Sequence, residues 1–223
     1  MGTLSKRFEQ KQAVMFGDSI AAYDHTLDEQ GNLLLGYEYW LEQLLGFQEV
    51  VNDGLPRYPF AHNPVTGEGI GEYIQQNYQP TDLILIAAGT NDFRLDVPLG
   101  TVSQNEDFDV KTTAGALQAT LQRVLTVNPK QKCVLMTPLM RDNSGYDIAS
   151  SNQAGYQLKD YREVIFELGK QYGIPVWDGY YHSGITMTNL KAHTRDGLHP
   201  NNAGYAVASQ SLAEFISSFV SID

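Results

Sequence analysis

The sequence of 223 residues contains a single cysteine, Cys133, which lies in the apolar run Cys133–Met136. One thiol cannot form a disulfide within the chain, and its apolar neighbours indicate a small core residue rather than a redox centre. Disulfide-stapled folds and thiol–disulfide chemistry within this chain are therefore excluded.

Positive charge is also scarce, with 15 Lys and Arg against 26 Asp and Glu and a formal net charge of −11. An acidic surface repels nucleic-acid phosphates and anionic lipid headgroups, so we expect no nucleic-acid partner. No apolar run is long enough to cross a bilayer, and residues 1–12 contain no apolar signal segment. The sequence thus predicts no membrane insertion and a cytoplasmic location.

Short apolar segments alternate with segments of helical periodicity along the whole chain. The predicted strands are 13–16, 49–51, 83–87, 132–137 and 174–177, and the predicted helices are 37–45, 69–77, 113–127, 156–172 and 201–220. This alternation is typical of a three-layer α/β domain with a mostly parallel sheet. No repeat or linker divides the chain, so we predict one domain over residues 1–223.

A candidate nucleophile follows the first predicted strand. Gly17 allows a tight turn there, and Ser19 then lies where its hydroxyl reaches the carboxyl edge of the sheet. A turn with a capping serine is the simpler interpretation of Gly17-Asp18-Ser19 when it is taken alone. The motif therefore needs partners before it predicts chemistry.

Such partners are found near the other end of the chain, in Asp196-Gly197-Leu198-His199-Pro200. Gly197 and Pro200 disfavour a helix around His199 and leave its imidazole free to project. Asp196 can bond Nδ1 of the same ring, which fixes the tautomer and stabilises the imidazolium ion. Together with Ser19, these residues provide the nucleophile, base and orienting acid of acyl transfer.

Two further polar turns come at the ends of predicted strands. Asn91, in Gly89-Thr90-Asn91-Asp92, can donate from its side-chain amide to a developing oxyanion. Gly54 follows the second strand, and its backbone N–H can approach a ligand closely. Each segment is also an ordinary turn, so neither predicts a site by itself.

Taken in order, the four segments resemble the SGNH hydrolase family, which is also called the GDSL esterase/lipase family. Its blocks are matched by Gly17-Asp18-Ser19, by Gly54, by Gly89-Thr90-Asn91-Asp92 and by Asp196-Gly197-Leu198-His199-Pro200. The resemblance spans nearly the whole chain, and the spaced set is far more specific than any single block. Two positions depart from the usual pattern: Ala21 stands where the family often has Ser or Thr, and Tyr23 where it often has Gly.

The resemblance implies a flavodoxin-like α/β/α fold with a five-stranded, mostly parallel sheet, and a serine esterase that needs no cofactor. It implies Ser19 as the nucleophile, His199 as the base and Asp196 as the orienting acid. The implied oxyanion hole combines the backbone N–H groups of Ser19 and Gly54 with the side-chain amide of Asn91. Asp18 is expected to hold the turn before Ser19.

Family substrates range from short acyl esters and lysophospholipids to acetylated sugars. Because no extended apolar loop suggests a lipid tunnel, we expect a short-chain acyl ester or an O-acetylated carbohydrate as the substrate. A lysophospholipase or thioesterase that acts on lipids is the alternative within the family. A non-catalytic carbohydrate- or protein-binding module is the alternative outside it.

His193, Asp196 and His199 could also be metal ligands, because they are spaced at three-residue intervals. A single ion would need a helix to collect all three, which Gly197 and Pro200 disfavour, and no other segment offers a convincing fourth ligand. We therefore predict no metal site, and a metallohydrolase is the competing hypothesis.

Three arginines, Arg57, Arg94 and Arg141, each follow the end of a predicted strand by a few residues. They fall in loops that should border the site, where they could orient a carboxylate, a phosphate or a sugar hydroxyl. The alternative is local pairing with nearby aspartates, and the sequence favours it. Those aspartates are Asp92, Asp96 and Asp142.

Overall fold

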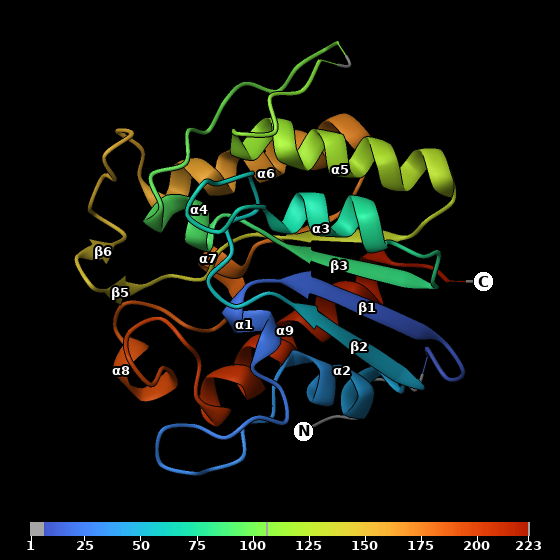
Figure 1. The fold of residues 1–223 in the computed structure, drawn as a ribbon. Coiled ribbons are helices and arrows are strands. Elements are labelled where there is room, and N and C mark those ends of the chain that lie inside the picture. Colours follow the sequence, from blue (N-terminus) through green and yellow to red (C-terminus); the bar gives the residue numbers. More distant parts are fainter. Residues whose placement is uncertain (1–6, 106, 223) are drawn as a thin grey trace.

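The computed structural model describes residues 7–105 and 107–222. At its centre lies a five-stranded sheet in the order β2-β1-β3-β4-β7 (Figure 1). The strands are β1 (Gln12–Gly17), β2 (Glu49–Gly54), β3 (Leu83–Ala87), β4 (Cys133–Met136) and β7 (Val176–Trp177). Every neighbouring pair is parallel, so the carboxyl ends of all five strands meet at one edge.

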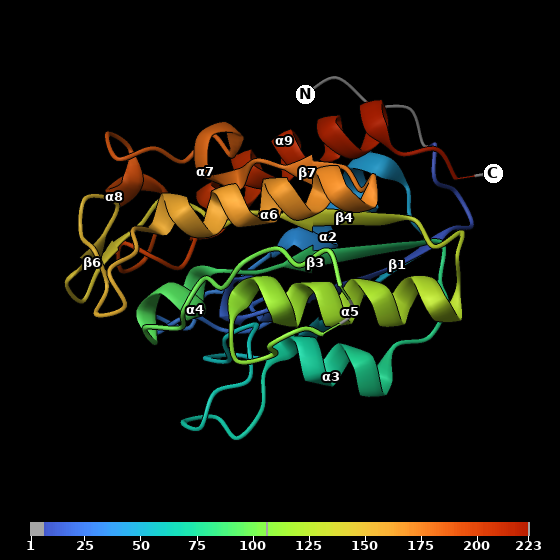
Figure 2. The same cartoon turned by 90° about the horizontal axis from the view of Figure 1, so that it is seen from above.

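The longer helices cover both faces of this sheet. On one face lie α2 (Tyr37–Leu45) and α9 (Asn202–Phe219), and on the other lie α3 (Ile70–Asn77), α5 (Thr113–Val127) and α6 (Leu158–Tyr172). Figure 2 shows the sheet between these two layers, with α2 and α9 above it and α3 and α5 below. The predicted three-layer α/β/α fold is confirmed.

The alternation of side chains in β3 shows why its sequence forms a central strand. Leu83 and Leu85 belong to the core shared with α2 and α9, whereas Ile84 and Ile86 belong to the core shared with α3, α5 and α6. All four side chains are fully buried. A strand covered on both faces needs such a continuous apolar run.

Short elements gather at the carboxyl edge of the sheet, on the left of Figure 1. They are the helices α1 (Ser19–Ala22), α4 (Thr90–Arg94), α7 (Gly179–His182) and α8 (Leu190–His193), and the hairpin strands β5 (Asp142–Asn143) and β6 (Tyr146–Asp147). This edge is where open α/β sheets bind their ligands. No helix among the described residues is long and apolar enough to span a bilayer.

The structure corrects the predicted end of the second strand. β2 continues past Val51 to Gly54, because Gly17 of β1 stands opposite Gly54 in parallel register. Gly54 is therefore the last residue of a strand and not part of a turn beyond it. The other predicted segments agree with the observed ones to within two residues at each end, and 37–45, 83–87 and 113–127 have the predicted bounds.

Candidate active site

Ser19 is the first residue of α1, directly beyond the end of β1. Asp18 caps this helix, since its Oδ1 accepts a hydrogen bond of 2.8 Å from the Ile20 N–H. A side chain at Gly17 would lie only 2.8 Å from the Ala21 Cβ, so the tight turn requires glycine. The expectation that Asp18 holds the turn before Ser19 is confirmed.

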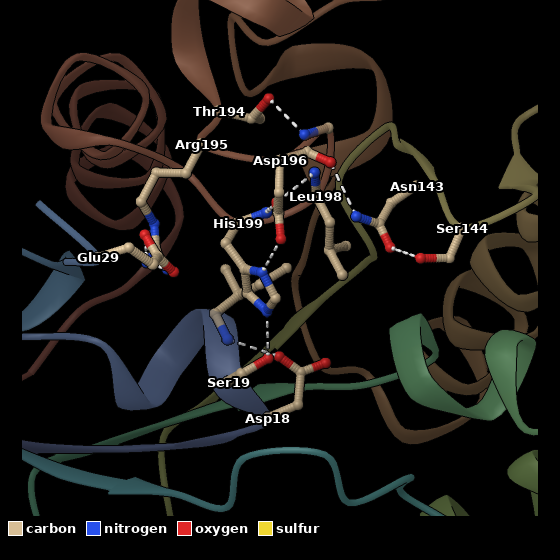
Figure 3. Close-up of polar contacts among 12 residues, drawn as sticks. Asp18, Ser19, Glu29, Asn143, Ser144, Thr194, Arg195, Asp196, Leu198 and His199 are labelled. Atoms are coloured by element: carbon tan, nitrogen blue, oxygen red, sulfur yellow. Dashed lines mark hydrogen bonds and ion pairs between the residues drawn. The ribbon is translucent and has the colours of Figure 1, made fainter.

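Ser19 lies beside His199 and Asp196, although they are far apart in the sequence (Figure 3). Ser19 Oγ lies 2.9 Å from His199 Nε2, and His199 Nδ1 lies 2.7 Å from Asp196 Oδ2. The other carboxylate oxygen of Asp196 accepts hydrogen bonds from the backbone N–H groups of Leu198 and His199, at 3.0 and 2.8 Å. The loop from Asp196 to His199 thus folds back on its own carboxylate and aims the imidazole at the serine.

The ionisation of Asp196 follows from these contacts. Partial burial by itself raises the pKa of the carboxyl group, but hydrogen bonds from the ring and backbone of His199 outweigh it. The pKa of Asp196 therefore lies well below its usual range. The carboxylate stays ionised at neutral pH, where it stabilises positive charge on the His199 ring.

Asn91 lies in α4, after a left-handed turn at Gly89, where φ is 98°. Its Nδ2 donates to the Tyr58 carbonyl at 3.0 Å, and its Oδ1 accepts from Arg94 Nε at 3.2 Å. These two bonds fix the orientation of the amide. Within the described residues, the second N–H of Nδ2 has no acceptor, so it can serve a ligand.

Gly54 packs against the helix that carries Ser19. A Cβ there would lie 2.5 Å from the Ala22 backbone nitrogen, so no larger residue fits. Its N–H donates to Asn52 Oδ1 at 3.0 Å, and an oxyanion would compete with that side chain for the same hydrogen. The place of Gly54 in an oxyanion hole stays a prediction.

Asp92 has a structural role that the sequence did not reveal. Its carboxylate is buried and accepts hydrogen bonds from the N–H groups of Phe60 and Ala61, at 2.8 and 3.1 Å, and from Thr113 Oγ1 at 3.1 Å. Burial raises the pKa of Asp92, although these donors oppose the change. Asp92 thereby ties the turn that holds Asn91 to the loop before α3.

Two of the three predicted arginines bond to the Thr90–Asn91 turn. Arg94 bonds Asn91 directly, and Arg141 Nη1 donates to the Thr90 carbonyl at 3.3 Å. Arg57 is the neighbour in sequence of Tyr58, whose carbonyl accepts from Asn91. The structure thus brings Arg94 and Arg141 together at one turn, whereas Arg57 is exposed and makes no side-chain hydrogen bond or ion pair within the described residues.

The predicted pairing of these arginines with aspartates was wrong. Among the described residues, no carboxylate lies within 4.0 Å of Arg57, Arg94 or Arg141. The physical reason for two of the three aspartates is that they bind backbone instead: Asp92 as described above, and Asp96 through its 2.7 Å bond from the Gln153 N–H.

Arg141 is fully buried and carries an unpaired charge. Its Nε donates to the Tyr146 carbonyl at 3.1 Å, whereas Nη2 has no hydrogen-bond partner in the described part of the chain. Burial lowers the pKa of Arg141 to about 10, although Asp18 and Asp196 act in the opposite direction. The guanidinium thus remains positive at neutral pH beside the site.

The β5–β6 hairpin also holds the Asp196–His199 loop. The Asp142 N–H donates to the Gly197 carbonyl at 2.8 Å. Asn143 Nδ2 donates to the Asp196 carbonyl, also at 2.8 Å (Figure 3). Gly197 has φ of 83°, and a Cβ there would lie 2.0 Å from the Asp142 carbonyl oxygen. The strands predicted from the sequence do not include β5 or β6.

The three possible metal ligands do not form one group. His193 lies in α8, and its Nδ1 is 3.1 Å from the Asn189 carbonyl oxygen, away from the His199–Asp196 pair. No set of three His, Cys, Asp or Glu side chains among residues 7–105 and 107–222 is arranged to hold a metal ion. The donor geometry therefore does not favour the metallohydrolase hypothesis.

Solved structures share the whole fold. A protein from Lactobacillus plantarum is 25% identical, with a TM-score of 0.82, over 96% of this chain and 99% of that one. The aryl esterase of M. smegmatis is 20% identical (TM-score 0.64; 94% and 100% covered). A carbohydrate acetylesterase family member from Sinorhizobium meliloti is 16% identical (TM-score 0.61; 94% and 98% covered).

No curated protein matches the sequence significantly. The model of the GDSL-like Lipase/Acylhydrolase family, in contrast, matches residues 15–207, which include Ser19, Asn91, Asp196 and His199. The α/β/α fold and the order of the motifs agree with this match. The chain is therefore a hydrolase that belongs to the GDSL-like lipase/acylhydrolase family, also known as the SGNH hydrolases.

Proposed function

We propose that this protein hydrolyses carboxylic esters through an acyl-enzyme formed on Ser19. The observation that carries the proposal is the unbroken hydrogen-bond chain from Ser19 Oγ through the imidazole of His199 to Asp196, with contacts of 2.9 and 2.7 Å. A serine needs such an adjacent base to become a nucleophile at neutral pH.

The reaction follows from the geometry of these groups. His199 Nε2 takes the proton of Ser19 as its Oγ attacks the ester carbonyl, and the ionised Asp196 stabilises the imidazolium. The same proton then passes to the departing alcohol. Water activated by His199 releases the acid from Ser19 and restores the enzyme.

Asn91 supports this chemistry as the main oxyanion donor. One N–H of its amide is bound to the Tyr58 carbonyl, and the other is available for the charge that develops on the carbonyl oxygen. The backbone N–H groups of Ser19 and Gly54 are the further donors in the proposal. For Gly54 this requires that the ligand displace the Asn52 side chain.

Short acyl groups are the proposed substrates, on a simple alcohol or on a carbohydrate. An aryl esterase and a carbohydrate acetylesterase with the same fold act on this kind of bond. A lipid hydrolase of the same family is the alternative.

The proposal is tested by p-nitrophenyl acetate turnover in the wild type, Ser19→Ala and His199→Ala. Both variants should lose turnover by a factor of at least about 10³, and a fluorophosphonate probe should label the wild type but not Ser19→Ala. Ser218→Ala is the matched control, because Ser218 lies on the exposed surface of α9. Full turnover by Ser19→Ala would refute the serine mechanism. A wild type that neither reacts with the probe nor turns over esters would favour a binding module.

The acyl and alcohol parts of the substrate are then separated with a panel of esters. p-Nitrophenyl esters of increasing acyl length test the limit on the acyl group, and O-acetylated sugars test the alcohol. We expect kcat/KM to fall as the acyl chain lengthens beyond a few carbons. A steady rise with chain length would favour the lipid hydrolase.

A further inference from the structure

Two positive charges, those of Arg94 and Arg141, lie beside Asn91 without a carboxylate partner in the described part of the chain. Two arginines elsewhere have such partners: Arg162 pairs with Asp178 and Glu163, and Arg195 with Glu29. In contrast, Arg57, Arg94 and Arg141 have no carboxylate within 4.0 Å among the described residues. The exposed Arg123 of α5 has no described carboxylate within this distance either, so what distinguishes Arg94 and Arg141 is that both bond to the Thr90–Asn91 turn.

Arg94 is placed to touch a ligand. Its Nε is held by Asn91 Oδ1 at 3.2 Å, and its side chain is partly exposed. Within the described residues, neither of its terminal nitrogens has a hydrogen-bond partner. A planar guanidinium with two free N–H edges is suited to a carboxylate or phosphate.

Arg141 adds a second positive charge close behind Arg94. It is fully buried, so it cannot itself contact a substrate. The two guanidinium groups are near enough that the charge of Arg94 contributes to lowering the pKa of Arg141. Asp18 and Asp196 act in the opposite direction on the pKa of Arg141, and the effect of Asp18 is larger than that of Arg94.

We propose that the ester substrate carries a negatively charged group, which Arg94 binds next to Asn91. This inference rests on the proposed esterase function and specifies the substrate class of the same site. The buried Arg141 adds positive charge near the anionic group without touching it. The group belongs to either the acyl or the alcohol part of the ester.

Covalent geometry limits where that group lies. The two amide atoms of Asn91 are about 2.3 Å apart, and an oxyanion lies about 3 Å from its donor. With the 3.2 Å between Asn91 Oδ1 and Arg94 Nε, the reacting oxygen is within about 8.5 Å of that nitrogen. At about 1.5 Å per bond, an anionic group three to five bonds from the ester carbonyl can reach Arg94.

Two matched ester pairs test the proposal. For the acyl side, p-nitrophenyl hemisuccinate is compared with its methyl-capped neutral ester; for the alcohol side, 3-acetoxybenzoate is compared with its methyl ester. In the wild type, kcat/KM should favour the charged member of one pair by about tenfold or more. Whichever pair shows the preference identifies the part of the substrate that carries the charge.

Arg94→Gln should remove this preference, and Arg94→Lys should keep part of it. The ratio of charged to neutral rates is the decisive readout, because Arg94 also orients Asn91. Loss of that orientation would slow both members of a pair alike, whereas loss of the cation slows only the charged member. Arg123→Gln, an exposed residue of α5, is the control and should leave the ratio unchanged.

The outcomes separate this inference from the function on which it rests. If neutral and charged esters are turned over equally in a Ser19-dependent reaction, or if Arg94→Gln leaves the ratio unchanged, the anionic substrate is refuted and the esterase stands. If no ester is turned over in a Ser19-dependent reaction, the esterase itself is refuted.

Discussion

Asn91 is held by two hydrogen bonds that leave one amide hydrogen for the reaction. Its replacement by alanine should lower kcat for p-nitrophenyl acetate by about 10²–10³, which corresponds to about 3–4 kcal/mol of barrier, with little change in KM. The donor acts on charge that exists only in the transition state, so kcat should fall while KM stays nearly unchanged. A change confined to KM would show that Asn91 contributes only to ground-state binding.

Glu38 is a buried acid without a hydrogen-bond partner for either carboxylate oxygen among the described residues. Burial, with the nearby charges of Asp24 and Glu42, raises its pKa from the ordinary 4.5 to about 8. The folded protein therefore holds this proton more tightly than the unfolded chain does. Its contribution to the free energy of unfolding is constant below the ordinary pKa and falls as the pH rises toward 8.

Glu38→Gln should abolish the fall in the free energy of unfolding that Glu38 causes as the pH rises. We expect the variant and the wild type to have similar free energies of unfolding at about pH 4.5, and the variant to be more stable by up to about 4 kcal/mol at about pH 8.5. Urea unfolding at both pH values measures the difference. Equal stability of the two proteins at the higher pH would show that Glu38 is solvated or paired in solution.

At the scale of elements, the β5–β6 hairpin links the two halves of the site. Arg141, at its start, bonds the Thr90 carbonyl, and Asp142 and Asn143 bond the loop that carries His199. The oxyanion turn and the acid–base loop therefore share one support. Displacement of the hairpin should impair catalysis before it impairs the sheet.

Gly197→Ala tests this support, and Gly145→Ala is its control. Both glycines have left-handed backbones, with φ of 83° and 82°, so both variants incur a similar strain of about 1 kcal/mol. Only at Gly197 would the new Cβ meet the Asp142 carbonyl, at 2.0 Å, since nothing lies within 4 Å of Gly145. We expect kcat to fall at least tenfold in Gly197→Ala alone, with the circular dichroism of both variants unchanged. Equal activities would contradict the role of the hairpin.

The sequence predicts the regular elements well because their burial is periodic. β3 alternates between two cores, and α5 has both predicted ends. The extension of β2 to Gly54 was missed, since polar Asn52 and Asp53 follow a strand only because β1 stands beside them. The local sequence pattern does not show which strand will lie beside a segment.

The candidate site likewise has parts that the local sequence predicts and parts that depend on tertiary contacts. Ser19, Asn91, Asp196 and His199 were identifiable because each lies in a short motif at the end of an element. The hairpin contacts, the backbone bonds of Asp92 and the unpaired state of the arginines depend on which distant backbone atoms come near. Sequence proximity of Arg94 to Asp92 and Asp96 suggested ion pairs that the fold does not form.

At the scale of the whole molecule, both cores are built on the same sheet, because β1, β3, β4 and β7 contribute side chains to each. We propose that the chain is a single domain and unfolds as one unit, because neither helical layer has a sheet of its own. Far-UV circular dichroism and the fluorescence of Trp40 and Trp177 should then give coincident urea transitions. Separate midpoints would show that the two layers come apart independently.

The bond between Ser19 and His199 joins residues 180 positions apart. Contacts of such long separation in sequence close large loops and form only after nearer segments are ordered. During refolding, ester hydrolysis should thus return no earlier than the spectroscopic signal of the sheet. The recovery of activity during refolding therefore reports when the contact between Ser19 and His199 forms. A lag between the spectroscopic signal and the activity would measure the duration of this last step.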